Sequence, residues 1–466
     1  MKTLKFIPKK SKHIDSLMST IPKLDESMFK SGPVQFYFPD VFRDNVKNLK
    51  SELTYFSFPI SIFFAHKANK SKVFVREAKK AGINIDVASL KELENALSNG
   101  FSGTKIECTG IKNEKFIQRS IENDCLLVVD SLDELRLIKE YSSKSHKPRI
   151  LFRISNIFPK QEGYARTTRF GISREEFIEL SKGKELQNYV VEGLHLHFDE
   201  YIPEHKAAMI NELLSMYSYL FQNNIFPKIL NIGGGYRFSL IEESEKESIM
   251  ESIEQTSFEQ VAYAQTIIGI EKGRNAKLSK TLVNDKLFPL KLFEFLKKVF
   301  DHNIENKLLI DELNLTLGLE PGYALLDNCG VIVMRVLGTK KINESKSAVI
   351  IDGNMYNLSN QMKKWVTDPI LLSKHTTSSN EPYEAFVMGN LCKEDDLLLD
   401  RKITFNKKPQ TGDLLLFCNT AGYSGSFEDT DAILQPRVKN YIFALDESGK
   451  TIIKTEKKYL EKNNDN

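Results

Sequence analysis

Residues 60–69 read ISIFFAHKAN, a mostly apolar run that is followed closely by a lysine. A short run of this kind is typical of a parallel β-strand covered on both faces. Seven similar runs follow, separated by helix-like stretches such as Ser89–Ser98, in which apolar residues recur at helical spacing behind the N-cap candidate Ser89. The later runs are Ile83–Ala88, Lys105–Thr109, Cys125–Asp130, Arg149–Ile154, Val191–His197, Ile229–Ile232 and Leu315–Leu319. Eight strands alternating with helices predict an α/β fold of the TIM (β/α)8 barrel type, although a doubly wound sheet alternates in the same way.

The pattern changes after Pro321, where strand-like runs are separated by turns without long periodic helices. These runs are Val331–Leu337, Ser347–Asp352, Tyr383–Met388, Asp413–Phe417 and Val438–Phe443. We therefore predict a barrel over residues 41–328 and a mostly-β domain over residues 329–466, with the N-terminal segment 1–40 packing on the β domain. The stretch from about 238 to 310 is much longer than the other strand-to-strand steps. It contains helical patterns at Ser244–Ser252 and Leu290–Val299, and we interpret it as an insertion on the barrel rim.

Composition excludes several classes of protein. Among 466 residues, 65 Lys plus Arg nearly balance 62 Asp plus Glu, which argues against a nucleic-acid binder and a polybasic membrane-surface protein. No apolar run approaches the ~18–20 residues of a membrane span, and Met1–Lys12 lacks the apolar core of a signal peptide. The five cysteines are scattered and form no CxxC pair, so neither disulfides nor a zinc site are indicated. We expect a cytoplasmic protein without a metal.

Chemically distinctive residues stand at the ends of five expected strands, at the face where barrels carry their active sites. Lys67 follows the first strand, Asp86 lies at the end of the second, His197 closes the sixth, Gly233-Gly234-Gly235 follows the seventh and Glu320 follows the eighth. Each has an ordinary alternative: a solvated lysine, a structural histidine, a tight turn or a turn carboxylate. Together they match the needs of pyridoxal 5′-phosphate. These needs are an amine for the aldehyde, a loop for the phosphate, a carboxylate for the pyridine nitrogen and a side chain to stack on the ring.

The sequence resembles the fold-type III pyridoxal-phosphate enzymes, the family of diaminopimelate, ornithine and arginine decarboxylases with an alanine-racemase-like barrel. Its motifs occur in the family's order from about residue 55 to 445, and the likeness is greatest to a divergent bacterial branch. In the barrel they are Phe64-Ala65-His66-Lys67-Ala68-Asn69, Ile85-Asp86-Val87-Ala88-Ser89, Phe152-Arg153-Ile154, Arg169-Phe170-Gly171, His195-Leu196-His197, Asn231-Ile232-Gly233-Gly234-Gly235-Tyr236 and Glu320-Pro321-Gly322. In the β domain they are Gly389-Asn390-Leu391-Cys392 through Asp396, and Ala421-Gly422-Tyr423.

The resemblance implies decarboxylation of an amino acid. It implies that Lys67 forms the Schiff base with the cofactor and that Cys392 donates a proton to Cα. Lys393 and Asp396 would lie at the substrate. It also implies a homodimer with the active site at the subunit interface, because the family's cysteine reaches the cofactor of the partner subunit. The other expected cofactor-binding residues are Asp86, Arg153, His197, Gly233, Gly234, Gly235, Glu320, Gly322, Tyr323 and Tyr423.

The sequence departs from the family's pattern near the phosphate and the substrate. Tyr323 replaces an arginine that helps to hold the phosphate, which predicts either weaker binding or another cation in its place. Asp199 and Glu200 stand where the family has Gly-Ser. Lys393 replaces an acidic residue, which favours a distal carboxylate on the substrate, unless Lys393 is only a solvated surface lysine. Two alternatives to decarboxylation remain at this point: an amino-acid racemase or epimerase, and a non-catalytic pyridoxal-phosphate-binding homologue.

Overall fold

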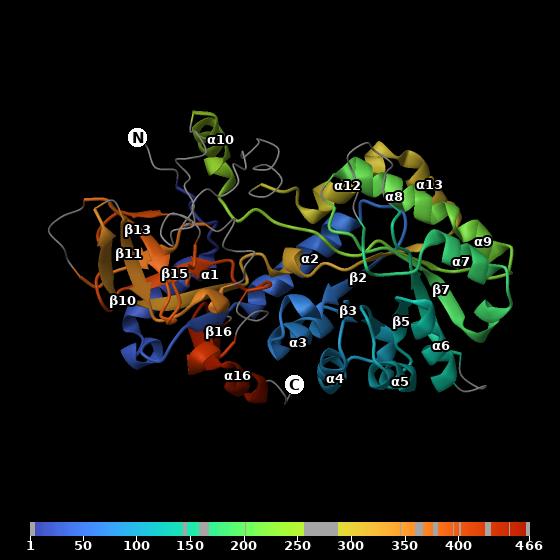
Figure 1. Cartoon of the computed structure of the whole chain (residues 1–466), viewed down its shortest axis with the longest axis horizontal. Coiled ribbons are helices and arrows are strands. Elements are labelled where there is room, and N and C mark those ends of the chain that lie inside the picture. The colour runs from blue at the N-terminus through green and yellow to red at the C-terminus, as the bar shows by residue number, and fades with distance from the viewer. Residues whose placement is uncertain are drawn as a thin grey trace. The chain divides into compact units, whose positions relative to one another are not determined.

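The computed structural model describes residues 5–142, 147–157, 167–200, 202–255, 288–344, 346–358, 367–375, 381–394, 396–399, 402–424, 430–446 and 448–462. The chain divides into two compact units (Figure 1). The barrel unit comprises residues 43–237 and 291–325, and the sheet unit comprises residues 1–42, 238–290 and 326–466. No helix of the described residues is both long and apolar enough to cross a membrane.

Within the described part of the barrel unit, eight parallel strands close into a barrel, and the prediction of a TIM (β/α)8 fold is confirmed. The strands are β2 (Ile60–Ala65), β3 (Asn84–Val87), β4 (Ile106–Cys108), β5 (Leu126–Val129), β6 (Arg149–Arg153), β7 (Val190–His195), β8 (Ile229–Asn231) and β9 (Thr316–Leu319). The ring closes where Ile60 of β2 pairs with Leu317 of β9. Residues such as Phe64, Leu151 and Leu230 are fully buried, as expected for strands that are covered on both faces.

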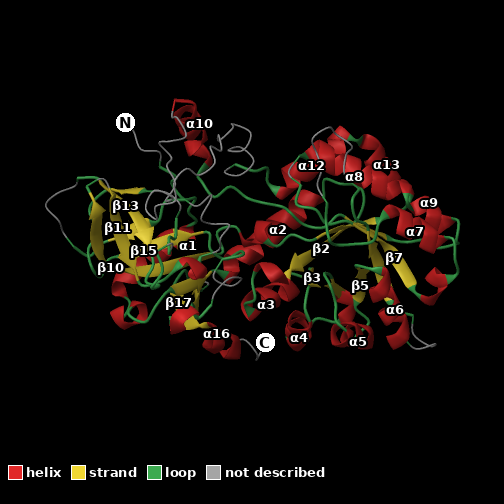
Figure 2. Ribbon diagram, viewed as in Figure 1, coloured by secondary structure: helices red, strands yellow, loops and turns green. Residues whose placement is uncertain are grey.

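Helices follow the strands and flank them on the outside (Figure 2). The helices of this unit are α3 (Lys72–Lys80), α4 (Leu90–Ser98), α5 (Glu114–Glu122), α6 (Leu132–Tyr141), α7 (Arg174–Ser181), α8 (Pro203–Ser215), α9 (Tyr217–Phe221), α12 (Leu292–His302) and α13 (Ile304–Glu312), with α2 (Pro39–Leu53) crossing the boundary between units. Several begin at a polar cap: the Ser89 hydroxyl, for example, accepts a hydrogen bond from the Glu92 N–H, as the sequence predicts. Such a cap is worth about 1 kcal/mol, and it fixes where each helix leaves its strand.

The long stretch between β8 and β9 contributes to both units. Its first described helix, α10 (Lys246–Gln255), belongs to the sheet unit, whereas α12 and α13 belong to the barrel unit. The amide of Asn306 in α13 donates to the carbonyl oxygen of Ala207 in α8 at 2.8 Å, and α12 also packs on α8. Helices α12 and α13 therefore form part of the helical layer of the barrel. Residues 256–287 of the expected insertion lie outside the described part of the chain.

The sheet unit is mostly β, as predicted. Its strands are β1 (Val34–Tyr37), β10 (Gly330–Asn343), β11 (Lys346–Ile351), β12 (Ile370–Leu372), β13 (Tyr383–Met388), β14 (Ile403–Phe405), β15 (Leu414–Cys418), β16 (Lys439–Leu445) and β17 (Thr451–Thr455), with helices α1 (Lys12–Thr20) and α16 (Glu456–Lys462). The strand order is β14-β13-β11-β10-β1-β16-β17, and β15 joins β10 to β12. The N-terminal β1 thus lies between β10, to which it is antiparallel, and β16, to which it is parallel.

Candidate active site

The C-terminal ends of the barrel strands carry most of the residues that the sequence singles out. Lys67 lies in a single helical turn, His66–Ala68, directly after β2, and Asp86 lies within β3. The glycines follow β8 and Glu320 follows β9. His197 was expected to close its strand, but β7 ends at His195. The Leu196 N–H still donates to the carbonyl oxygen of Asn231, and the chain leaves the sheet after that bond.

Lys67 pairs with a buried aspartate. Its Nζ lies 3.4 Å from Asp86 Oδ2, and the hydroxyl of Thr109 donates to Asp86 Oδ1 at 2.5 Å. Burial raises the pKa of Asp86 to about 6; the positive charge of Lys67 opposes this rise and the negative charge of Glu320 adds to it. Asp86 is therefore ionised at neutral pH and can hold the ammonium of Lys67. Because the Lys67 side chain keeps 30% of its surface exposed, its amine is accessible to a ligand.

Glu320 is a buried carboxylate held by two histidines. Its Oε1 lies 2.6 Å from His195 Nε2, and its Oε2 lies 3.0 Å from His197 Nδ1. Burial acts to raise the pKa of Glu320, but the two imidazoles outweigh this effect and hold the pKa well below its usual range. Burial also lowers the pKa of both imidazoles, that of His197 to about 4. At neutral pH the site thus holds an anionic carboxylate between two neutral rings. The sequence analysis assigned a role only to the second histidine.

The glycine loop has no room for side chains. A Cβ atom on Gly233, whose φ is +69°, would lie 2.5 Å from the carbonyl oxygen of Leu196, and one on Gly234 would lie 2.6 Å from that of Glu320. The Gly233 N–H donates to the side-chain oxygen of Asn231 at 2.7 Å. The glycines therefore let this loop approach the ends of β7 and β9 directly. Gly322 is similar, because its Cβ would lie 2.8 Å from the Cβ of Ala68. Tyr323 begins the short helix that follows, Tyr323–Leu326.

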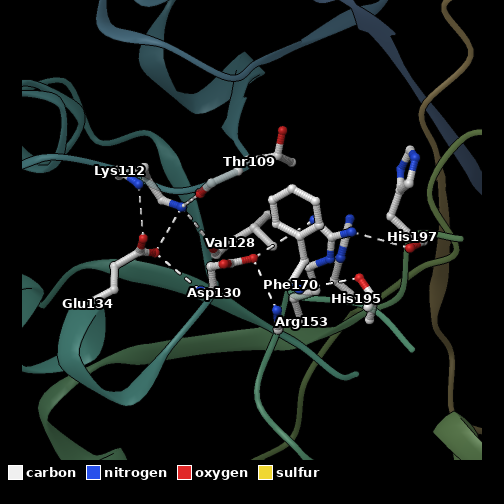
Figure 3. Close-up of polar contacts among 12 residues, drawn as sticks. Thr109, Lys112, Val128, Asp130, Glu134, Arg153, Phe170, His195 and His197 are labelled. Atoms are coloured by element: carbon white, nitrogen blue, oxygen red, sulfur yellow. Dashed lines mark hydrogen bonds and ion pairs between the residues drawn. The ribbon is translucent and has the colours of Figure 1, made fainter. Parts of the chain in front are cut away.

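Arg153, at the end of β6, is buried beside the histidine motif. Figure 3 shows its guanidinium directed toward the backbone of His197, whose carbonyl oxygen accepts from Nη2 at 3.2 Å. Nη1 lies 3.8 Å from Asp130 Oδ1, and the guanidinium carbon lies 4.6 Å from the centre of the Phe170 ring. The Gly171 N–H donates to the same Asp130 oxygen at 3.1 Å. Arg153 and Asp130 thus hold Phe170 and Gly171 beside the site.

The sequence analysis missed a buried ion pair near this cluster. The Lys112 side chain is fully buried, and its Nζ lies 2.8 Å from Glu134 Oε1 (Figure 3). The same Nζ donates to the carbonyl oxygens of Gly110 and Val128, both at 2.7 Å. An ammonium with three acceptors is fully satisfied, and removing one partner of such a pair typically costs about 3–5 kcal/mol. We assign Lys112 to the support of the strand ends and not to ligand binding.

A second missed residue, Glu107 of β4, lies inside the barrel. It is fully buried, and the Asn231 amide nitrogen donates to both of its oxygens, at 2.8 and 2.9 Å. Burial first, and then the negative charges of Glu320 and Asp86, raise the pKa of Glu107 well above its usual range. Burial and the neighbouring negative charges therefore favour the protonated form of Glu107. The only signal in the sequence was an acid within the apolar run Lys105–Thr109.

Replacing Glu107 by Gln is expected to change how stability depends on pH. Above the ordinary glutamate pKa the unfolded chain releases a proton that folded Glu107 keeps. The folded wild type therefore loses stability as pH rises toward the raised pKa, by up to about 1.4 kcal/mol per pH unit. Glutamine does not titrate. The melting temperature of Glu107→Gln should therefore rise relative to that of the wild type as pH increases above the ordinary glutamate pKa. Parallel melting curves would contradict the buried protonated acid. Glu52→Gln, which removes an exposed carboxylate from α2, is the control.

Four predicted residues belong to the sheet unit. Cys392 and Lys393 are exposed, in the loop after β13. Asp396 is buried, and its two oxygens accept hydrogen bonds from the Met355 and Leu391 N–H groups, both at 2.8 Å. Asp396 thus organises the loop that carries Cys392. Tyr423 follows β15 and has a positive φ of 50°.

Comparison with known proteins finds a matching family model and relatives that cover most of the chain. A family model described as "Pyridoxal-dependent decarboxylase, pyridoxal binding domain" matches residues 40–276. An uncharacterised protein of Sinorhizobium fredii is 26% identical over 433 residues, which cover 90% of this chain and 89% of the relative. Diaminopimelate decarboxylase of Aquifex aeolicus is 24% identical over 381 residues, which cover 78% of this chain and 76% of the relative.

Solved structures of low identity share the fold. Helicobacter pylori diaminopimelate decarboxylase in complex with L-lysine has a TM-score of 0.68 at 19% identity, covering 92% of this chain and 94% of that chain. Arginine decarboxylase of Paramecium bursaria Chlorella virus has a TM-score of 0.69 at 16% identity, covering 92% and 100%. Because the family model spans half of the chain, this protein belongs to the pyridoxal-dependent decarboxylase family, as a divergent member, and is a carboxy-lyase that depends on pyridoxal 5′-phosphate.

Proposed function

We propose that this enzyme releases CO2 from an amino acid or amino-acid conjugate, with Lys67 bound covalently to the cofactor and Cys392 returning a proton to Cα. The observation that carries the proposal is the cluster at the C-terminal ends of the barrel strands. There an accessible amine, an ionised buried carboxylate and a glycine loop come from strands far apart in the sequence.

The residues of this cluster fit pyridoxal 5′-phosphate. Lys67 offers an amine for the aldehyde, and Glu320 offers a charge that keeps a pyridine nitrogen protonated. The glycine loop lacks the Cβ atoms that would keep a phosphate from its backbone. When bound, the cofactor draws electrons away from Cα and so stabilises the charge left by the departing CO2.

Lys67 must lose a proton before its amine attacks an aldehyde. Asp86 orients the amine and holds it as the ammonium until then. The raised pKa of Asp86, about 6, makes this carboxylate a better proton acceptor than an exposed aspartate. Thr109 fixes the other Asp86 oxygen, so that only Oδ2 faces the lysine.

Glu320 is proposed to bind the protonated ring nitrogen. Each of its oxygens already has one histidine partner, and each oxygen can accept a further hydrogen bond from the nitrogen. His195 is fully buried, whereas the side chain of His197 is 25% exposed, and so His197 is the partner that can leave. Released from Glu320, its ring can stack on the cofactor, while Arg153 continues to hold the His197 backbone.

The phosphate end is proposed to involve Gly233, Gly234, Gly235, Gly322, Tyr323 and Tyr423. The first four are glycines of two loops whose backbones approach their neighbours closely. Tyr423 belongs to the sheet unit, and its role, like that of Tyr323, rests on the matching family motifs.

We propose that Cys392 donates the proton to Cα in the partner subunit of a homodimer. Its thiol is exposed, which favours a chemical role over that of a buried apolar residue. Lys393 beside it favours a substrate with a distal carboxylate, and Asp396 supports the loop. None of the five described cysteines forms a disulfide within the chain, which supports a reducing compartment such as the cytoplasm.

The test is to incubate the cofactor-loaded protein with a panel of acidic and basic amino acids and to follow CO2 and amine by mass spectrometry. We expect CO2 release, with acidic substrates preferred over ornithine, lysine and diaminopimelate. In D2O, Cys392→Ala should still release CO2 but should lose stereospecific deuteration of the amine, and Cys392→Ser serves as the conservative control.

Other outcomes separate the alternatives. Exchange or inversion at Cα without CO2 would support a racemase, and no turnover of any amino acid by loaded protein would support a non-catalytic homologue. Preference for the basic set would overturn the inference from Lys393. Unchanged amine stereochemistry in Cys392→Ala would remove the role of that thiol.

A further inference from the structure

A buried lysine lies against the start of the glycine loop. Lys206, in the first turn of α8, is 1% exposed, and its Nζ donates to the carbonyl oxygen of Ile232 at 2.8 Å. Ile232 directly precedes Gly233. An ammonium has three donors, and among the described residues no carboxylate forms an ion pair with this one. Buried charges are normally paired, so an unpaired cation at this place calls for an anion.

The nearby acids already have partners of their own. Asp199 lies 3.3 Å from Arg237, and Glu200 lies 3.3 Å from His205 and accepts from the Ile202 N–H at 3.0 Å. Burial lowers the pKa of Lys206 to about 8, and the charges of Glu320, Asp199 and Glu200 oppose this change. Lys206 therefore stays mostly protonated at neutral pH.

The loop beside Lys206 needs a cation. Tyr323 is neutral where the resemblance implies an arginine, and a Cβ on Gly235 would lie only 3.1 Å from Asp199 Oδ1, so an acid borders this loop. Arg237 offsets the charge of Asp199, so a phosphate dianion at this loop needs a further cation for its own charge. We propose that Lys206 is the cation that binds the cofactor's phosphate group. This proposal rests on the proposed function, since it assumes that pyridoxal 5′-phosphate binds at the glycine loop.

The experiment compares two ligands that differ only in the phosphate. Binding of pyridoxal 5′-phosphate and of pyridoxal is titrated by absorbance with the wild type, Lys206→Met and Lys206→Arg. We expect Lys206→Met to weaken the binding of pyridoxal 5′-phosphate about 10- to 100-fold, because a charge-assisted hydrogen bond is lost. The affinity for pyridoxal should be unchanged. Inorganic phosphate should compete with the cofactor for binding to the wild type. It should not compete for binding to Lys206→Met. Lys206→Arg should bind nearly as the wild type does.

Two further variants make the result decisive. Lys228→Met removes an exposed charge just before β8, at the opposite end of that strand, and should change neither affinity. Tyr323→Arg in the Lys206→Met background should restore phosphate-dependent affinity. If Lys206→Met proves unstable, Tyr323→Arg is tested alone. It should tighten the binding of pyridoxal 5′-phosphate less than tenfold, because the wild type already has a cation at the phosphate. A larger gain in affinity would overturn the proposal.

Equal weakening of both ligands by Lys206→Met would show a purely structural lysine and overturn the proposal. Failure of the wild type to bind either ligand would instead contradict the proposed function. The two failures are therefore distinguishable.

Discussion

Replacing Lys67 by alanine is expected to abolish covalent attachment of the cofactor and to lower decarboxylation on the order of 10³-fold or more. The Lys67 side chain is 30% exposed, and its amine lies beside Asp86 at the mouth of the barrel. Lys206, near the glycine loop, has a buried side chain. Single-turnover CO2 release and the absorbance of the bound cofactor measure the two effects.

Two controls distinguish the loss of the primary amine from the loss of a positive charge. Lys67→Arg keeps a cation beside Asp86 but lacks a primary amine, so it should fold normally and fail in the same way. Lys70→Ala removes an exposed lysine three positions along the chain and should be fully active. Activity of Lys67→Ala within tenfold of the wild type would rule out the covalent role of Lys67.

Replacing Glu320 by Gln is expected to lower the rate of decarboxylation about 10²- to 10³-fold while the cofactor remains bound. Glutamine has the same shape and keeps a hydrogen bond to His195, but it lacks the charge that holds a ring nitrogen in its protonated form. Because the proposed covalent bond is at Lys67 and not at Glu320, the loss should appear in kcat and not in cofactor content.

Glu320→Asp is the matched control, because it keeps the charge and shortens the side chain by one methylene. We expect it to retain more activity than Glu320→Gln. If Glu320→Gln were fully active, or if it failed only by losing the cofactor, the proposed contact with the ring nitrogen would be wrong.

The sequence predicts the strands of the barrel unit more completely than those of the sheet unit. Several barrel strands are mostly apolar because both faces are covered, so runs such as Ile60–Ala65 are visible without alignment. In the sheet unit, β12, β14 and β17 were missed, and β1 was not recognised within the N-terminal segment. These strands are three to five residues long. So few residues give little periodicity, and their pairing partners are remote in the sequence.

The candidate site shows a similar division. Lys67, Asp86 and Glu320 were found because each stands at a strand end, where the barrel topology alone brings side chains together. Lys112, Glu107 and Lys206 were missed because their burial depends on packing between elements. A lysine in a helix or loop is usually solvated, and only the structure shows that Lys112 meets Glu134 while Lys206 meets Ile232.

The most direct test is to reduce the cofactor-loaded wild-type protein with borohydride and to map the modified peptide by mass spectrometry. We expect a single reduced pyridoxyl-phosphate group on the amine of Lys67, and none when the protein is Lys67→Ala. A protein that takes up no cofactor, or an adduct fixed on another lysine such as Lys206, would contradict the covalent role of Lys67.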